Sequence, residues 1–497
     1  MSQPTRAEWE ARAKTLKIEG RAFIQGEYLA AASGETFDCI SPVDGRLLAK
    51  VASCDAADAE RAVQSARATF DSGVWSREAP ATRKAVMIRF AALLEEHAEE
   101  LALLETLDMG KPIGDSLNVD LPGAADSLRW SGEAIDKVYD EVAATSHDQL
   151  GLVTREPVGV VAAIVPWNFP LMMAAWKLGP ALATGNSVIL KPSERSPLTA
   201  IRIAQLAIEA GLPAGVLNVL PGYGHTVGKA LALHMDVDTA VFTGSTKIAK
   251  QLMVYAGESN MKRVWLEAGG KSPNIVFEDA PDLQAAAESA AAAIAFNQGE
   301  VCTAGSRLLV QKSIKAKFLP LVVEALKGWK AGHPLDPDTN VGALVDGRQL
   351  EQVLGYIQAG QDEGAKILTG GKRVLEETGG TYVEPTLFDG VSNAMKIARE
   401  EIFGPVLSVI EFEDAEEAIR IANDTQYGLA AAVWTRDISK AHLTARALRA
   451  GSVWVNMYDG GDMTAPFGGF KQSGNGRDKS LHAFDKYTEL KATWIKL

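Results

Sequence analysis

Residues 158–266 alternate short β-branched runs with segments of helical spacing. The runs cover 158–165, 187–190, 215–220, 239–242 and 264–266, and the helical segments cover 171–183, 197–210, 224–234 and 246–257. Such alternation is typical of βαβ units, in which parallel strands lie side by side under helices. Because parallel sheets bind ligands at the carboxyl ends of their strands, we expect a binding site at that edge.

A second α/β region is predicted after Gly269. Strands are expected at 273–277, 306–311, 405–411, 429–434 and 452–455, and helices at 282–297, 313–328, 347–363, 414–423 and 437–449. Upstream, amphipathic spacing predicts helices at 53–72 and 82–107, the second ended by Gly110 and Pro112. The glycine-rich segment 458–477 predicts a long loop, and the alternating tail 487–497 predicts an edge strand that adds to a partner.

Length and composition exclude several classes of protein. A chain of 497 residues is too long for one core, which predicts two or three domains. A net charge of −13 argues against a nucleic-acid partner. The most apolar stretch, 158–176, is interrupted by Pro166, Asn168 and Pro170, so we predict no membrane span.

Cysteine usage and the N-terminus bear on the compartment. Three cysteines in a chain of this length do not make a disulfide framework. The first ten residues are polar and carry acids, unlike a signal or transit peptide. Both features favour a cytoplasmic protein.

Cys302 is the strongest candidate for a reactive group. It lies in the run FNQGEVCTAG at residues 296–305, where Gly299 and Gly305 let the backbone approach a ligand closely. A thiol becomes a strong nucleophile where its surroundings favour the thiolate and leave it accessible. Most free cysteines are instead buried small side chains, and we interpret Cys39 and Cys54 in that way.

This run and the segment WLEAGGK at residues 265–271 resemble the NAD(P)-dependent aldehyde dehydrogenase superfamily. The resemblance extends from about Phe23 to about Trp494, and within the superfamily it is greatest to the bacterial γ-glutamyl-γ-aminobutyraldehyde and other ω-aminoaldehyde dehydrogenases. It implies an α/β fold with a Rossmann-type parallel-sheet NAD domain, an α/β catalytic domain and a small β oligomerisation arm. It also implies NAD-dependent oxidation of an aldehyde to a carboxylic acid.

Asn168 and Glu267 supply the two functions that such a reaction needs beside the thiolate. Addition of Cys302 to an aldehyde creates an oxyanion, and release of the resulting thioester needs an activated water. An asparagine in a proline-stiffened loop is most often an ordinary turn residue, but Asn168 matches the family's oxyanion residue. Glu267 alone would be a capping or ion-paired residue, but it matches the family's general base.

The cofactor site is predicted at the ends of two strands. Glu194 follows the strand 187–190, where an acid accepts hydrogen bonds from both adenosine-ribose hydroxyls and repels a 2′-phosphate, so NAD is preferred over NADP. The segment 242–245 opens a helix whose N-terminus suits a pyrophosphate. By resemblance, the cofactor-binding residues are Val165, Pro166, Trp167, Lys191, Ser193, Glu194, Gly224, Phe242, Gly244, Ser245, Glu401 and Phe403.

Two further residues match family positions near the water route to Glu267. They are Lys177 and Asp478, and the second is usually a glutamate in the family, so the shorter side chain argues against a direct proton relay. The seven histidines show no metal-ligand spacing, and no catalytic metal is expected.

The resemblance also assigns a substrate tunnel. Glycines at 460–461 are expected to widen its mouth, and Asp462, with Asp115 or Asp120 near the entrance, is expected to attract a cationic or polar tail. The alternative for the apolar members is ordinary core packing, above all for Met173. The predicted tunnel residues are Phe169, Met173, Trp176, Phe296, Val301, Thr303, Gly461, Asp462 and Phe467.

Domain roles and assembly are implied by the same resemblance. A dinucleotide-binding domain would comprise residues 1–137 and 158–269, a catalytic domain residues 270–483, and oligomerisation segments residues 138–157 and 484–497. The expected assembly is a homo-oligomer, a tetramer built as a dimer of dimers.

Alternative functions stay open at this stage. The enzyme would be a broad-specificity or betaine-type aldehyde dehydrogenase if the tunnel acids do not select the substrate. A cysteine-dependent esterase would need Cys302 and Asn168 but no dinucleotide. A non-catalytic NAD-binding structural protein would need none of the three catalytic side chains.

Overall fold

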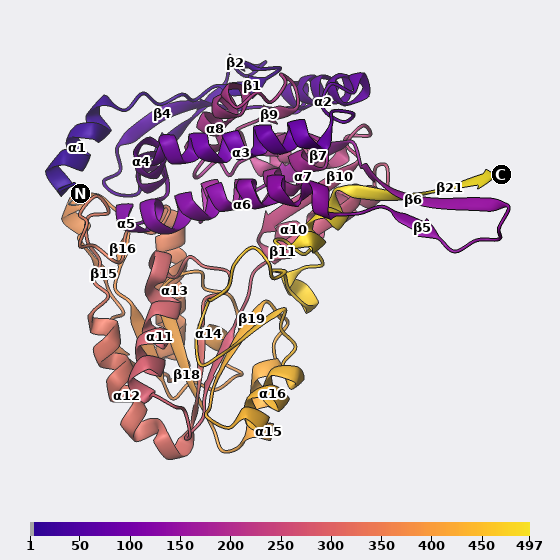
Figure 1. The fold of residues 1–497 in the computed structure, drawn as a ribbon. Helices are drawn as coiled ribbons and strands as arrows, with labels where there is room; N and C mark the ends of the chain where they lie inside the picture. Colours follow the sequence, from indigo (N-terminus) through magenta and orange to yellow (C-terminus); the bar gives the residue numbers. More distant parts are fainter. Residues whose placement is uncertain (1–3) are drawn as a thin grey trace.

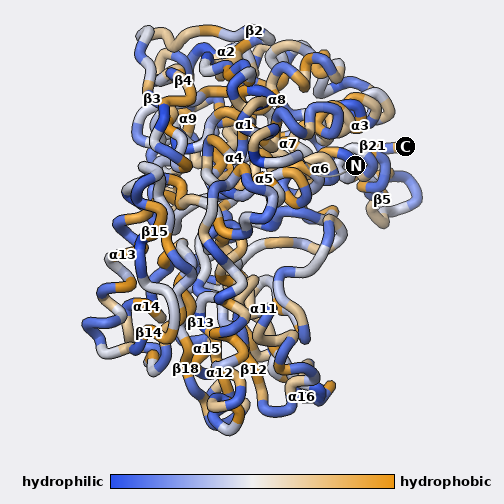
Figure 2. The backbone as a smooth tube through the Cα atoms, turned by 90° about the vertical axis from the view of Figure 1, so that its left-hand side faces the viewer, coloured by the Kyte–Doolittle hydropathy of each residue, from blue (hydrophilic) through white to orange (hydrophobic). Residues whose placement is uncertain are grey.

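The computed structural model describes residues 4–497 as two α/β lobes and a projecting β arm (Figure 1). Residues 1–3, the start of the polar N-terminal segment that argued against a targeting peptide, lie outside the described part. Figure 2 shows the hydrophobic segments gathered in the two sheets and in the helices packed on them. No helix among residues 4–497 is long and apolar enough to cross a membrane.

The upper lobe is built on a seven-stranded sheet that contains the predicted βαβ units. Five strands run parallel, and the hairpin of β1 and β2 adds antiparallel at one edge. Their order is β11 (Arg263–Ala268), β10 (Thr239–Gly244), β7 (Val160–Ile164), β8 (Ser187–Lys191), β9 (Leu217–Val219), β1 (Ala22–Ile24) and β2 (Glu27–Leu29).

Helices cover this sheet and bury its central strands completely. The helices of this lobe are α2 (Ala56–Ser72), α3 (Pro80–Glu96), α4 (Ala98–Met109), α6 (Leu121–Ala134), α7 (Pro170–Ala183), α8 (Leu198–Glu209), α9 (Lys229–Leu233) and α10 (Thr246–Gly257), of which α2, α7, α8 and α10 pack directly on the strands. Every residue of β7 and β8 is buried, as a parallel sheet covered on both faces requires.

The lower lobe holds a second seven-stranded sheet, parallel except for one edge strand. Its order is β14 (Lys366–Thr369), β17 (Thr386–Asp389), β18 (Val406–Phe412), β13 (Arg307–Gln311), β12 (Pro273–Val276), β19 (Ala430–Trp434) and β20 (Ser452–Val455). The helices packed around it are α11 (Leu283–Ala295), α12 (Lys312–Lys327), α13 (Gly347–Asp362), α14 (Lys396–Arg399), α15 (Ala415–Asn423) and α16 (Ile438–Ala447).

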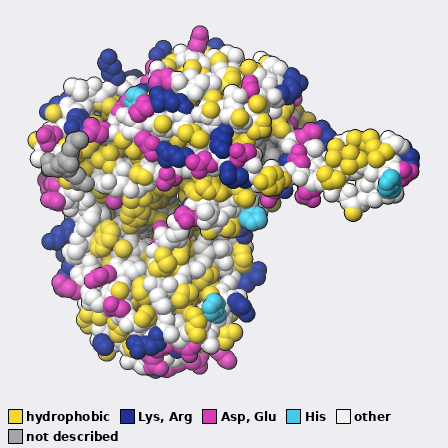
Figure 3. Space-filling model, in the orientation of Figure 1, with side chains coloured by type: hydrophobic (Ala, Val, Ile, Leu, Met, Phe, Trp, Pro, Cys, Tyr) yellow, Lys and Arg dark blue, Asp and Glu magenta, His cyan; other side chains and the backbone are white. Residues whose placement is uncertain are grey.

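The arm is a three-stranded antiparallel sheet that projects from the upper lobe. It consists of β5 (Glu141–Ala143), β6 (Gln149–Pro157) and β21 (Thr488–Lys496), with β6 in the centre. The predicted edge strand at the tail therefore exists: it pairs with β6 of its own chain on one side and stands at the edge of the arm's sheet. Figure 3 shows apolar side chains gathered on this arm, and its exposed members include Val142, Leu490, Trp494 and Ile495.

Several elements differ from the sequence prediction. The helix expected over 82–107 is two helices, α3 and α4, that meet at His97, whose backbone leaves the helical region. The helix expected over 224–234 opens with a π-helical turn at 224–228. The prediction missed α1 (Arg6–Thr15), α5 (Ile113–Asp115), α6, and the short strand pairs β3 (Thr36–Ile40) with β4 (Leu47–Ala52) and β15 (Arg373–Val374) with β16 (Tyr382–Val383).

Gly110 ends α4 as predicted and also joins the two lobes. Its φ is 93°, and a Cβ there would lie 2.5 Å from the carbonyl oxygen of Ala343 in the lower lobe. The Ala343 N–H donates to the Gly110 carbonyl at 3.0 Å. Only glycine allows both this conformation and this approach, so the helix end and the contact between the lobes depend on one residue.

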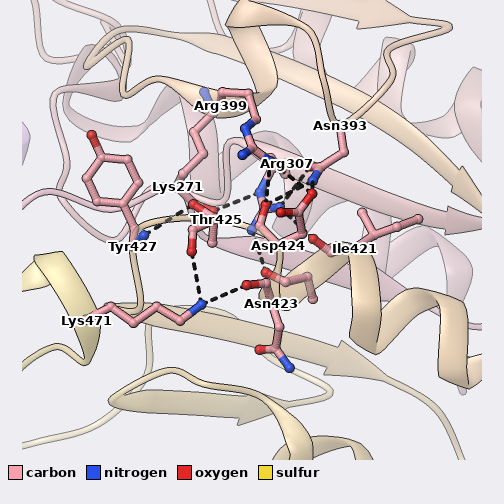
Figure 4. Close-up of polar contacts among 11 residues, drawn as sticks. Lys271, Arg307, Asn393, Arg399, Ile421, Asn423, Asp424, Thr425, Tyr427 and Lys471 are labelled. Carbon is pink, nitrogen blue, oxygen red and sulfur yellow. Dashed lines mark hydrogen bonds and ion pairs between the residues drawn. The ribbon is translucent and has the colours of Figure 1, made fainter.

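Arg307 joins the start of β13 to the last turn of α15 (Figure 4). Its side chain is fully buried, and all its hydrogen bonds go to neutral oxygens. Nε donates to Lys271 O at 2.9 Å, and the two Nη atoms donate to Asn393 Oδ1, Ile421 O and Ala422 O at 2.8–3.1 Å. A guanidinium with its fixed fork of donors is the side chain suited to hold several carbonyls at once.

Arg307→Met should therefore destabilise the lower lobe by about 3–5 kcal/mol, because it leaves these buried acceptors without a donor. Urea unfolding followed by tryptophan fluorescence measures the shift in midpoint. Arg348→Met, at an exposed position of α13, is the matched control and should keep the wild-type midpoint. Equal midpoints for both variants would contradict this role of Arg307.

Candidate active site

A cavity of about 1380 Å³ lies between the lobes, at the carboxyl ends of the upper sheet's strands. It opens where Figure 3 shows the surface hollowed between them. The predicted site residues line it with three exceptions: Lys177 is buried behind the wall, and Asp115 and Asp120 lie outside the cavity. The sequence-based expectation of a ligand site at this edge is thus matched by a real cavity.

A strained turn carries Cys302 into this cavity. After α11 ends, three successive residues have positive φ: Asn297 (47°), Gln298 (56°) and Gly299 (70°). For the first two this backbone costs about 1–3 kcal/mol each, which the surroundings must offset. Gln298 Oε1 accepts from Gly342 N at 2.9 Å, and a Cβ on Gly299 would lie 2.3 Å from Gly404. The turn is therefore packed tightly against the segments around Gly342 and Gly404, and this packing fixes the position of the thiol.

Asn168 is tied directly to the same turn. Its Nδ2 donates to Glu300 O at 2.8 Å, while Asn297 Nδ2 donates to Asn168 O at 3.0 Å. The amide is 4% exposed and lines the cavity. An amide nitrogen carries two hydrogens, so one remains for a ligand when the first is used. Asn168 and Cys302 thus belong to one rigid unit, as an oxyanion donor and its nucleophile must.

Glu267, at the end of β11, is a buried carboxylate with no hydrogen bond to either oxygen. Two glycines make room for it, since a Cβ on Gly468 or Gly476 would lie within 2.9 Å of its Oε1. Burial raises the pKa of Glu267 well above its usual value, and the Asp478 carboxylate raises it further. An unpaired buried carboxylate with a raised pKa is suited to accept a proton.

Lys177, Asp478 and Lys486 form a buried charge group next to Glu267. Lys177 Nζ contacts Asp478 Oδ2 at 2.5 Å, and Lys486 binds the other oxygen. Burial acts to raise the pKa of Asp478, but the two lysines hold it below its usual value. Lys177 and Lys486 also lower the pKa of Glu267. The group therefore tunes Glu267 through charge, and Lys177 acts from behind the cavity wall.

The cavity's second half fits a dinucleotide. Glu194 follows β8, where Lys191 Nζ contacts its Oε2 at 3.3 Å; burial opposes ionisation, yet Lys191 holds the pKa of Glu194 below its usual value. Ser245 caps α10 at the end of β10, and Thr243 Oγ1 is buried there without a partner. A helix N-terminus next to an unpartnered hydroxyl is a site for an anionic group, and an ionised Glu194 is a site for ribose hydroxyls.

Glu401 and Phe403 lie between the two halves. The Glu401 Oε1 accepts from Gly270 N at 3.0 Å, and a Cβ on Gly269 would lie 2.0 Å from its Oε2. Burial raises the pKa of Glu401 to about 7. Phe403 has a φ of 57° and packs edge-on against Trp167 at 5.1 Å. These residues place a carboxylate and an aromatic face next to Cys302 and the end of β11.

The predicted tunnel is aromatic, but two predicted acids lie outside it. Trp176 packs on Phe467 with ring centroids 5.1 Å apart. Asp115 and Asp120 were predicted near the tunnel entrance, but neither lines the cavity. Asp120 is instead buried in an ion pair with Lys111 at 2.5 Å. Sequence spacing could not show this, because both lie in helical turns that the prediction missed.

Asp459 and Lys479 line the tunnel and were missed. Asp459 accepts from Thr303 Oγ1 at 3.4 Å, one residue from the nucleophile. The sequence could have indicated Asp459, because it lies in the same glycine-rich loop as Asp462. It could also have indicated Lys479, which directly follows Asp478. Among residues 4–497, no three His, Cys, Asp or Glu side chains are grouped so as to hold a metal ion.

Similar proteins share this architecture over the whole chain. Residues 28–493 match the model of the aldehyde dehydrogenase family. The NADP/NAD-dependent aldehyde dehydrogenase PuuC of Escherichia coli (strain K12) is 58% identical over 491 residues, 99% of this chain and 98% of that protein.

Two solved structures are similar as well. The indole-3-acetaldehyde dehydrogenase AldA of P. syringae, solved as a C302A mutant with NAD+ and IAA, is 84% identical with a TM-score of 0.99 and covers all of both chains. The γ-glutamyl-γ-aminobutyraldehyde dehydrogenase of Burkholderia cenocepacia J2315 is 64% identical with a TM-score of 0.98, covering 99% of this chain and 100% of that one.

The charges around Cys302 make a testable prediction. Burial raises the pKa of its thiol, and Asp459, Glu401 and Glu267 raise it further. Asp459→Asn removes one negative charge, so the thiolate fraction at pH 8 should rise and alkylation by iodoacetamide should be several-fold faster. Mass spectrometry of the Cys302 peptide measures the rate. Thr303→Val, which removes only the hydrogen-bond donor to Asp459, is the control, and an unchanged rate in Asp459→Asn would contradict the electrostatic argument.

Proposed function

Because the chain belongs to the aldehyde dehydrogenase family, we propose that it oxidises ω-amino or γ-glutamylamino aldehydes to carboxylic acids with NAD. The observation that carries the proposal is the cavity shared by the Cys302 thiol, the Asn168 amide and the unpaired carboxylate of Glu267. A thiol, an oxyanion donor and a proton acceptor are the groups that thioester formation and hydrolysis require.

The first half of the reaction uses Cys302 and Asn168. The Cys302 thiolate adds to the aldehyde carbon, and the free amide N–H of Asn168 donates to the oxygen that becomes negative. NAD, when bound, supplies the acceptor for the hydride that leaves this carbon, so that a thioester on Cys302 remains. The strained turn keeps the Cys302 sulfur and the Asn168 amide in place during the addition and during the departure of the hydride.

The second half uses Glu267. Its carboxylate takes a proton from water, and the resulting hydroxide attacks the thioester, which releases the carboxylic acid and the Cys302 thiolate. The raised pKa of Glu267 makes it a stronger base than an ordinary carboxylate. The positive charges of Lys177 and Lys486 limit that increase.

The cofactor proposal rests on Glu194, Glu401 and the start of α10. Glu194 would hold the adenosine ribose, Glu401 the nicotinamide ribose, and the residues around Ser245 the pyrophosphate. An ionised Glu194 repels a 2′-phosphate, which favours NAD. NADP is accepted less well; the relative PuuC is named as using both.

The substrate proposal has one competitor that a specific observation favours. Acidic side chains at the mouth, above all Asp462, and the relatives PuuC and the Burkholderia enzyme support an amino-tailed aldehyde. The aromatic wall of Phe169, Trp176, Phe296 and Phe467, together with the relative AldA, favours indole-3-acetaldehyde. Broad or betaine-type specificity remains the third possibility.

The assembly, domain roles and location are proposals of the same kind. The exposed apolar side chains of the arm support a homo-oligomer, proposed as a dimer of dimers. The upper lobe would bind the dinucleotide and the lower lobe carry the catalytic thiol. Three cysteines without a disulfide support the cytoplasm.

Glu267→Gln should stop the reaction at the thioester. The glutamine fills the same space but cannot accept a proton, so one equivalent of NADH should form and the protein should gain the mass of the acyl group. Intact-mass spectrometry with a stopped-flow absorbance trace measures both. Cys302→Ala should give neither signal while NAD still binds. Full turnover by Glu267→Gln would contradict the assignment of the base.

The substrate proposal is tested by NADH formation with a panel of aldehydes. It comprises γ-glutamylaminobutyraldehyde, 4-guanidinobutyraldehyde, betaine aldehyde, indole-3-acetaldehyde and propanal. We expect the highest kcat/KM with the amino-tailed members and a smaller preference for them in Asp462→Asn, because that variant removes a negative charge from the mouth. A preference for indole-3-acetaldehyde would favour the competitor, and equal rates would remove the substrate claim.

A further inference from the structure

Lys479 places a positive charge in the tunnel wall that the reaction described above does not use. It follows Asp478, has a φ of 57° and is half-buried. Its Nζ lies 4.7 Å from the ring centre of Trp176 and 6.0 Å from that of Phe467. The ammonium therefore lies on the aromatic wall and lines the cavity.

The ammonium keeps its donors available. Its contacts with the two rings are electrostatic and use no acceptor atom, and in residues 4–497 it forms neither a hydrogen bond nor an ion pair. Burial lowers the pKa of Lys479, while Asp459 and Asp462 act against that change. A lysine with three N–H donors and no acceptor is suited to an anionic ligand.

The charges around it set the chemistry of that ligand. Asp459 and Asp462 line the same part of the cavity, so the wall presents one cation with two carboxylates nearby. A lone ammonium group would face Lys479 as a like charge, and a lone carboxylate would face the two aspartates. An end group that carries both charges finds a partner of opposite sign for each.

We propose that Lys479 and Asp462 together bind the amino-acid end of the aldehyde, with its carboxylate on Lys479 and its ammonium on Asp462. This inference rests on the proposed function and narrows its substrate class to aldehydes with a zwitterionic far end. Lys479 is then a specificity-determining residue that acts on binding, and the chemistry at Cys302 stays with the residues already named.

Another role for the same charge is stabilisation of the Cys302 thiolate, whose charge favours the protonated form of Lys479. The two roles differ in what they change. A contact with the far end acts on KM and only on substrates that carry a carboxylate. A contact with the thiolate acts on every aldehyde and moves the pH profile of kcat/KM.

The test compares wild type with Lys479→Met, which keeps the length and apolar stem of the side chain. KM and kcat are measured with γ-glutamylaminobutyraldehyde, 4-guanidinobutyraldehyde and propanal, and the pH profile is recorded with propanal. We expect the KM for the γ-glutamyl substrate to rise roughly tenfold relative to that for propanal. The KM for the guanidino substrate should fall relative to propanal, since a like charge is gone.

Two further variants complete the test. Lys479→Arg should restore the preference for the γ-glutamyl substrate, because the charge is kept. Lys366→Met, at an exposed position of β14, removes the same charge far from the cavity and should match wild type. Asp462→Asn should raise the KM of both the γ-glutamyl and the guanidino substrate.

Each outcome decides between the alternatives. An equal change in KM for all three aldehydes, or a shifted pH profile with propanal, would overturn the far-end contact and favour the thiolate. If wild type prefers the γ-glutamyl substrate and Lys479→Met keeps that preference, the Lys479 assignment alone is wrong. If wild type itself shows no preference for amino-tailed aldehydes, the proposed function fails first and this inference with it.

Discussion

The packing of the Asn297–Gly299 turn against Gly342 and Gly404 is the contact on which the rest of the site depends. It holds two non-glycine residues at positive φ, and the close packing is possible because Gly342 leaves room for Gln298 and Gly299 itself lies against Gly404. Asn168 is bonded into the same turn. Cys302 of the lower lobe and Asn168 of the upper lobe are thus positioned by one packed and hydrogen-bonded contact.

Charge balance is the second constraint. The carboxylates of Asp459, Glu401 and Glu267 raise the pKa of the Cys302 thiol, and burial raises the pKa of all four groups. Lys177 and Lys486 offset part of this charge from behind the wall. The same negative surroundings therefore raise the pKa of Glu267 and favour the protonated form of the Cys302 thiol, so the two groups are coupled through charge.

The regular elements and the site residues were largely predictable, and the failures have physical causes. Buried parallel strands such as β7 and β8 are continuous apolar runs, which the sequence displays directly. His97 breaks a helix although no glycine or proline marks the position, and α6 carries two glycines and an early proline, which are not typical of a helix. Nearly every residue that the aldehyde dehydrogenase resemblance assigned to the site lines the cavity, whereas the positions of Asp115, Asp120 and Lys479 depend on tertiary packing that spacing does not encode.

The distance along the chain between Glu267 and its charge partners bears on how the protein becomes active. Asp478 is 301 residues from Lys177 and is held by Lys486, just before β21 completes the arm. During synthesis, all strands of both sheets are made before Asp478 and Lys486. A nascent chain can therefore form the strands of both sheets before the charge group beside Glu267 is complete, because Asp478 and Lys486 come only in the segment directly before β21.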